Sequence, residues 1–187
     1  MKNGSTALGT ILCFAHHRPP TRCADRLGAV GPGNPGNGRD LASLAAPVRI
    51  DIAYGGSCTA GKCEDFDRYH EVLAWVASRG LRVAEGVRLY LQFGTVAVGA
   101  YCAENGFLAV FAQVGAEILQ PACGACANCG PGVSERADQV TVSAINRNFP
   151  GRSGAGRVRL ASPPTVAASA IAGELISFAD LQARYAG

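Results

Sequence analysis

The sequence predicts an α/β fold, a mostly parallel sheet with flanking helices. Segments with the alternating, β-branched pattern of strands take turns with segments of helical spacing along the chain. This succession is typical of βαβ units, whose strands run parallel. The composition is that of a folded domain rich in turns, because 48% of the 187 residues are apolar, 17% are charged and 24 are glycine.

The expected elements follow one another closely from residue 48 onward. A strand is expected over 48–54, where β-branched residues alternate with others. A helix follows over 64–78, because its apolar residues recur near helical spacing and Gly80 stands behind it as a stop signal. The remaining elements are strand 87–93, helices 96–104 and 108–114, strands 117–119, 139–143 and 157–161, and a helix over 163–172 that two prolines open.

Composition divides the chain into a leader and one domain. Residues 1–45 are predicted to be a flexible Gly/Pro-rich leader, and residues 46–187 the folded α/β/α domain. The leader's Cys13, His16, His17 and Cys23 match no common zinc-finger spacing. No apolar run suits a bilayer, no signal peptide is recognised, and the net charge of +3 is too small to indicate nucleic acid or an anionic membrane as a partner. We therefore expect a cytoplasmic protein with eight cysteines, of which the clustered ones serve as metal ligands rather than in disulfides.

A Gly- and Pro-rich turn over residues 121–132 holds Cys123, Cys126 and Cys129 at three-residue steps. Glycine permits the backbone angles that let such a turn aim several thiolates at one point. Cys58 follows another glycine turn after the first expected strand, and sites in open α/β sheets form beyond the carboxyl ends of the strands. Three thiolates suit an iron–sulfur cluster with one open iron, whereas a four-thiolate zinc or electron-transfer site would recruit Cys129 or Cys63. Spacing alone leaves these alternatives nearly even.

A second motif, Asn146-Arg147-Asn148-Phe149-Pro150-Gly151-Arg152, follows the strand expected at 139–143. A guanidinium group fits a carboxylate in a bidentate manner, so the two arginines indicate a di- or tricarboxylate substrate. Two solvated surface arginines are the alternative interpretation. The glycines that follow do not make a dinucleotide fingerprint, because no helix clearly comes after them.

Several motifs stand in an order that resembles the aconitase superfamily, and most closely the large subunit of 3-isopropylmalate dehydratase and related hydro-lyases. The resemblance runs from about residue 48 to the C-terminus and is carried by residues 56–59 (Gly-Ser-Cys-Thr), 123–126 (Cys-Gly-x-Cys), 146–152, 161–163 (Ala-Ser-Pro) and 167–173. In relatives, the first motif usually continues with Asn-Ser, where this chain has Ala60 and Gly61.

The resemblance implies roles for six residues. Cys58, Cys123 and Cys126 match the three ligands of a 4Fe–4S cluster whose remaining iron is open. Arg147 and Arg152 match positions that bind substrate carboxylates, and Asn146 lies in the same active-site loop. The family reaction removes water from a hydroxy acid and adds it back. Cys63 and Cys129 are additional thiols.

The family enzymes also contain parts that have no counterpart among the motifs of this chain. They carry a long N-terminal region with histidine and acidic groups, and a swivelling domain, often a separate small subunit, that supplies a serine base. His16, His17 and His70 lie outside the family's histidine motifs. We therefore interpret the chain as the carboxyl-terminal, cluster-bearing portion of a large subunit, with a hydroxy-carboxylate substrate, a small subunit as partner and no catalytic residue assigned. A non-catalytic iron–sulfur domain or an inactive remnant is the alternative.

Overall fold

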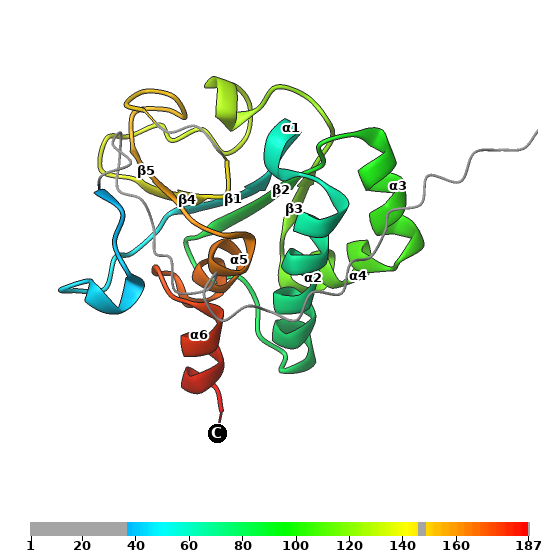
Figure 1. Ribbon diagram of the computed structural model, residues 1–187, viewed down its shortest axis with the longest axis horizontal. Coiled ribbons are helices and arrows are strands. Elements are labelled where there is room, and N and C mark those ends of the chain that lie inside the picture. The colour runs from blue at the N-terminus through cyan, green and yellow to red at the C-terminus, as the bar shows by residue number, and fades with distance from the viewer. Residues whose placement is uncertain (1–36, 146–148, 187) are drawn as a thin grey trace, which may run out of the picture.

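The computed structural model describes residues 37–145 and 149–186. Five strands form one sheet in the order β3-β2-β1-β4-β5, and every pair is parallel. The predicted α/β fold with a parallel sheet and flanking helices is confirmed (Figure 1). The elements are η2 (Leu41–Ser43), β1 (Ile52–Gly56), α1 (Ser57–Ala60), α2 (Cys63–Ser78), β2 (Arg88–Gln92), α3 (Val96–Glu104), α4 (Phe107–Val114), β3 (Glu117–Leu119), η3 (Ala125–Ala127), β4 (Val140–Ser143), β5 (Arg157–Leu160), α5 (Pro163–Ala172) and α6 (Phe178–Arg184).

The strand order reverses at β1, which lies in the middle of the sheet. The chain first builds outward through β2 and β3, then returns to the other side of β1 with β4 and β5. Tyr54 of β1 stands beside Tyr90 of β2 and Ser143 of β4. The loops that leave β1 and β4 therefore start from neighbouring positions on the carboxyl edge, where open α/β sheets place their sites.

Helices cover one face of the sheet and build the main hydrophobic core there. Helix α2 packs against α4 and α5, and α5 also contacts β1 (Figure 1). Ala53, Leu89, Leu91 and Val142 of the strands face this layer and are fully buried. They meet the aromatic residues of the helices, among which Phe66 lies with its ring 5.1 Å from Phe93 and 6.1 Å from Phe111, centroid to centroid.

A smaller hydrophobic cluster lies on the opposite face of the sheet. It contains Ile52, Tyr54 and Tyr90 from β1 and β2, together with Ala125 and Ile145. This face is covered by the 120–139 segment, which carries the cysteine turn, and not by a long helix (Figure 1). The alternation of side chains along β1 and β2 thus divides each strand between the helical core and the support of the cysteine turn.

The helices begin and end where the sequence supplies caps. The Asp65 carboxylate accepts the Lys62 backbone N–H at the start of α2, and Thr95 Oγ1 accepts the Val98 N–H at the start of α3. Helix α6 was not among the expected elements. Its signal was the short Ser177-x-x-Asp180 pattern, in which Ser177 Oγ accepts the Asp180 N–H and donates to the Asp180 carboxylate.

The first strand begins later than its pattern predicts. Only residues 52–56 pair with β2 and β4, whereas the strand was expected over 48–54. The preceding residues pair elsewhere, since the Ile50 N–H donates to Gly173 O and the Leu175 N–H donates to Val48 O. The extended pattern of residues 48–50 is therefore satisfied by the chain that follows α5, whereas the backbone of Asp51 already bonds to Val140 and Arg88 of the sheet.

The predicted leader lies mostly outside the described residues. Its described end, residues 37–45, contains the turn η2, and Leu41 and Leu44 pack against the main core. The boundary at residue 45 stays a prediction. Across the two described ranges, no helix has both the length and the apolar character needed to cross a membrane.

The aromatic contacts of Phe66 predict a large effect of its truncation. Because its side chain is fully buried among Tyr69, Phe93 and Phe111, Phe66→Ala should lower the free energy of unfolding by about 3–5 kcal/mol. Val96 is 78% exposed, and Val96→Ala should change it by less than about 0.5 kcal/mol. Urea unfolding of both variants checks this, and similar losses would contradict the described core.

Candidate iron–sulfur and carboxylate site

Cys58 lies just beyond β1, where the backbone turns sharply. Gly56 has φ 93°, and a Cβ there would lie 1.9 Å from Gln92 O. Ser57, which follows, has φ 74°, a conformation that costs a non-glycine residue about 1–3 kcal/mol and occurs most often at functional sites. The turn leads directly into α1 and leaves Cys58 exposed at the carboxyl edge of the sheet.

Gly61 explains part of the departure from the Asn-Ser continuation in the first motif. Gly61 O accepts the Gly94 N–H at 3.0 Å, so the end of α1 lies against the chain leaving β2. A Cβ at Gly61 would lie 2.5 Å from Ser57 O and 2.7 Å from Gly94 N. In this chain, a side chain at position 61 would push the Cys58 turn away from β2.

The cysteine turn is built around a single 3₁₀ turn, η3, which is closed by backbone hydrogen bonds. Gly124 O accepts the N–H groups of Ala127 and Cys129, and Cys129 Sγ lies 3.4 Å from the same oxygen. Asn128 ends the turn in the left-handed conformation, with φ 57°. Cys123 and Cys129 are exposed, whereas Cys126 is partly buried against the smaller cluster.

Tyr54 and Gln92 support this turn from below. The Tyr54 hydroxyl donates to Gln92 Oε1 at 2.5 Å, and Gln92 Nε2 donates to the carbonyls of Gln120 and Ala122. A Cβ on Gly124 would lie 2.5 Å from the Tyr54 hydroxyl oxygen. Sequence reasoning assigned no role to Tyr54 or Gln92, because in the sequence each is simply one residue of an alternating strand.

The electrostatics of Tyr54 show which thiols surround it. Burial raises the pKa of the Tyr54 hydroxyl well above its usual value, and the charges of Cys126, Cys129 and Cys58 raise it further, while a backbone hydrogen bond from Ala125 has the opposite effect. Cys58 and Cys126, from segments far apart in the sequence, therefore lie in the electrostatic neighbourhood of one tyrosine.

The predicted ligands do not form a mononuclear metal site. Within residues 37–145 and 149–186, no three His, Cys, Asp or Glu side chains are grouped so that they could hold a metal ion. An iron–sulfur cluster requires a different arrangement of ligands, because each of its thiolates binds a separate iron. The donors fit such a cluster in chemistry, because they are free thiols on glycine-rich turns that follow strands of one sheet.

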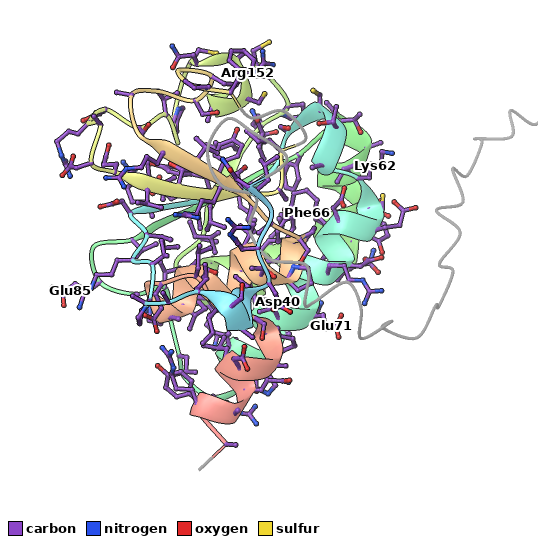
Figure 2. The ribbon with its side chains drawn as sticks, turned by 60° about the vertical axis from the view of Figure 1, so that its left-hand side comes forward. Asp40, Lys62, Phe66, Glu71, Glu85 and Arg152 are labelled. Carbon is purple, nitrogen blue, oxygen red and sulfur yellow. The ribbon has the colours of Figure 1, made fainter. Side chains whose placement is uncertain are left out.

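Arg152 lies in the loop between β4 and β5, at the end of the molecule remote from Glu85 (Figure 2). Its guanidinium carbon lies 5.3 Å from the centre of the Phe149 ring, and its backbone N–H donates to Phe149 O. Its Nε is buried without a hydrogen-bond partner in the described structure. A buried guanidinium nitrogen of this kind is suited to an anionic ligand. The other two expected substrate-binding residues, Asn146 and Arg147, lie outside the described residues.

His70, Cys63 and Cys102 pack among hydrophobic side chains of the helical layer. His70 stacks on Phe107 with ring centroids 3.9 Å apart, and burial lowers the pKa of its imidazole. It belongs to the packing of α2 against α4 and not to the cysteine turn. Cys63, at the start of α2, packs against the main core. Cys102 of α3 is fully buried, and burial raises the pKa of its thiol to about 12.

These surroundings predict a clear order of thiol reactivity. At pH 8, iodoacetamide should modify the exposed Cys58, Cys123 and Cys129 in the folded apoprotein. Cys102 should react at least about a hundredfold more slowly, because the thiolate is the nucleophile and a raised pKa leaves little of it. Peptide mass analysis before and after unfolding in urea measures both. Labelling of Cys102 at the rate of Cys58 would contradict the described burial.

Comparison with known proteins assigns the fold and its motifs to one family. The model of the aconitase family (aconitate hydratase) matches residues 38–173. These include Cys58, the cysteine turn and the loop around Arg152 (residues 149–156, the arginine loop). The 3-isopropylmalate dehydratase large subunit of Clostridioides difficile (strain 630) is 36% identical over 143 residues, 75% of this chain and 32% of that protein. The chain thus spans about a third of the length of the curated relative it matches. The resemblance predicted from the motifs is confirmed: the chain belongs to the aconitase family.

Proposed function

We propose that this chain is the cluster-bearing part of a hydro-lyase that acts on hydroxy di- or tricarboxylic acids. One observation carries the proposal. In a chain of the aconitase family, the Cys58 turn, the cysteine turn and the arginine loop all lie at the carboxyl edge of one parallel sheet. A soft-metal donor set next to a guanidinium group suits a substrate that carries both a hydroxyl and carboxylates.

Cys58, Cys123 and Cys126 are the proposed ligands of a 4Fe–4S cluster. When bound, such a cluster supplies an iron without a protein ligand, which acts as a Lewis acid toward a hydroxyl oxygen. The protein's contribution is to hold the thiolates in place. The glycines around Cys58 and the Tyr54–Gln92 pair under Cys126 keep both turns close to the sheet.

Arg152, with Arg147 and Asn146 of the same loop, is proposed to bind and orient the substrate carboxylates. The buried Nε of Arg152 already lacks a partner in the described structure, so a carboxylate would complete its hydrogen bonding. The cation–π contact with Phe149 limits where the guanidinium group can lie. A guanidinium group that is already held in place loses less conformational entropy on binding and selects the orientation of the bound acid.

The proposed partner is a small subunit that carries the swivelling domain. The chain matches a protein named as a large subunit and spans about a third of it. Cys58, Cys123 and Phe149 at the site edge are exposed, as a surface covered by other parts of an enzyme would be. We also propose a cytoplasmic location, because Cys58, Cys123 and Cys126 are free thiols and a reducing compartment preserves them.

The ligand assignment predicts which thiols the cluster needs. After anaerobic reconstitution with iron and sulfide, the wild-type chain should show the visible absorption and Mössbauer spectrum of a 4Fe–4S cluster. Cys123→Ser and Cys58→Ser should each lose most of the bound iron. Cys129→Ser is the matched control, since it lies in the same turn and a serine hydroxyl can keep the hydrogen bond to Gly124 O. Equal loss in the control would overturn the three-ligand assignment.

The proposed role of Arg152 predicts a defect in substrate binding. The reconstituted chain, mixed with the rest of a relative's large subunit and its small subunit, should hydrate unsaturated dicarboxylates such as maleate. Arg152→Gln should raise KM by about tenfold or more, because a bidentate charged hydrogen bond is lost. Arg136→Gln is the control, as Arg136 is exposed and pairs with Asp138. A normal cluster without any turnover would support the non-catalytic iron–sulfur domain instead.

A further inference from the structure

Ser134 connects the segment of the cysteine turn to the arginine loop. It is almost completely buried and lies five residues after Cys129. Its backbone N–H and its hydroxyl both donate to Ser153 O, at 3.1 and 3.0 Å. Its hydroxyl accepts the Gly156 N–H at 2.8 Å, and its carbonyl accepts the Ala155 N–H at 3.1 Å. One serine therefore makes four hydrogen bonds to three residues on either side of Gly154, namely Ser153, Ala155 and Gly156.

Glycine brings the two segments into direct backbone contact at this point. Gly154 has φ 102°, and a Cβ there would lie 2.1 Å from Ser134 O. A Cβ on Gly156 would lie 2.9 Å from the Ser134 side chain. The loop therefore has no room to move toward Ser134, and moving away breaks the four hydrogen bonds. The contact fixes the loop in both directions.

Arg152 depends on this contact for its position. It immediately precedes Ser153, and in the described structure its side chain forms no ion pair with a carboxylate. Its own contacts are with Phe149, which belongs to the same loop. Beyond residue 152, the backbone groups of Ser153, Ala155 and Gly156 all bond to Ser134, so a displacement at Ser153 would be passed directly to the neighbouring Arg152.

We propose that Ser134 is a positioning residue for carboxylate binding: it fixes the arginine loop to the segment of the cysteine turn and so sets where Arg152 meets the substrate. The inference rests on the proposed function, because it assumes that Arg152 binds a carboxylate. Ser134 does not contact the substrate, and it acts only through the backbone of residues 153–156.

Two measurements on the apo chain test the link without any turnover. The first is amide hydrogen exchange at Ala155 and Gly156, whose N–H groups bond to Ser134. Both amides should be protected in the wild-type chain, and Ser134→Ala should speed exchange of the Gly156 amide by about tenfold, the effect of losing one net hydrogen bond. Unprotected amides in the wild-type chain would overturn the proposal even if the variant failed to fold.

The second measurement is the dissociation constant for malate, determined by isothermal titration calorimetry, which needs no signal from the substituted residue. Ser134→Ala should weaken malate binding by about tenfold, Arg152→Gln should abolish the response, and iron uptake on reconstitution should stay normal in Ser134→Ala. Ser177→Ala is the matched control, because it removes another buried serine hydroxyl with two hydrogen bonds, at α6, and should bind malate as the wild type does.

The outcomes separate this inference from the proposed function. If the wild type binds malate, Arg152→Gln does not, and Ser134→Ala binds like the wild type, the role of Ser134 is wrong while that of Arg152 stands. If Arg152→Gln and the wild type respond alike, the carboxylate role of Arg152 is wrong and the inference falls with it. Equal weakening in Ser134→Ala and Ser177→Ala would show a general loss of stability and would also overturn it.

Discussion

The Tyr54 hydroxyl lies beneath the cysteine turn and donates to Gln92 Oε1, between neighbouring strands in the middle of the sheet. Gln92 in turn donates to two carbonyls of the chain that enters the cysteine turn. A polar pair buried in this way is stable only when its hydrogen bonds are satisfied, so the turn and the sheet constrain each other. The cysteine turn is thus positioned by β1 and β2, although it follows β3.

Glycine makes this arrangement possible at three places. Gly124 and Gly132 let the turn lie directly on Tyr54, and Gly56 lets the Cys58 turn lie on the backbone of Gln92. Gly154 likewise allows close backbone contact between Ser134 and the arginine loop. Contacts between backbones fix distances more tightly than contacts between flexible side chains. The turns are therefore held by the sheet, while Cys58 and Cys123 stay exposed.

The sequence predicted most of the fold because most of its signals are local. Helix α2 and the strands β2 to β5 lie within a residue or two of their expected positions, since side-chain periodicity and caps act over a few residues. Two features were missed. Helix α6 has only a short capping pattern, and residues 48–50 have a strand pattern that is satisfied by the chain after α5. A strand pattern indicates an extended backbone, but it does not identify the segment with which that backbone pairs.

The fold class, the family and the residue types of the candidate site could all be predicted from the amino-acid sequence, because the cysteine and arginine motifs stand in a fixed order along the chain. The support of these motifs became visible only in the folded chain. Tyr54 and Gln92 are 38 positions apart, and Ser134 and Ser153 are 19 apart, so no local pattern reveals that they bond. Burial gives these hydrogen bonds their importance, because an unpaired polar group inside a protein is costly, and burial is a property of the folded chain alone.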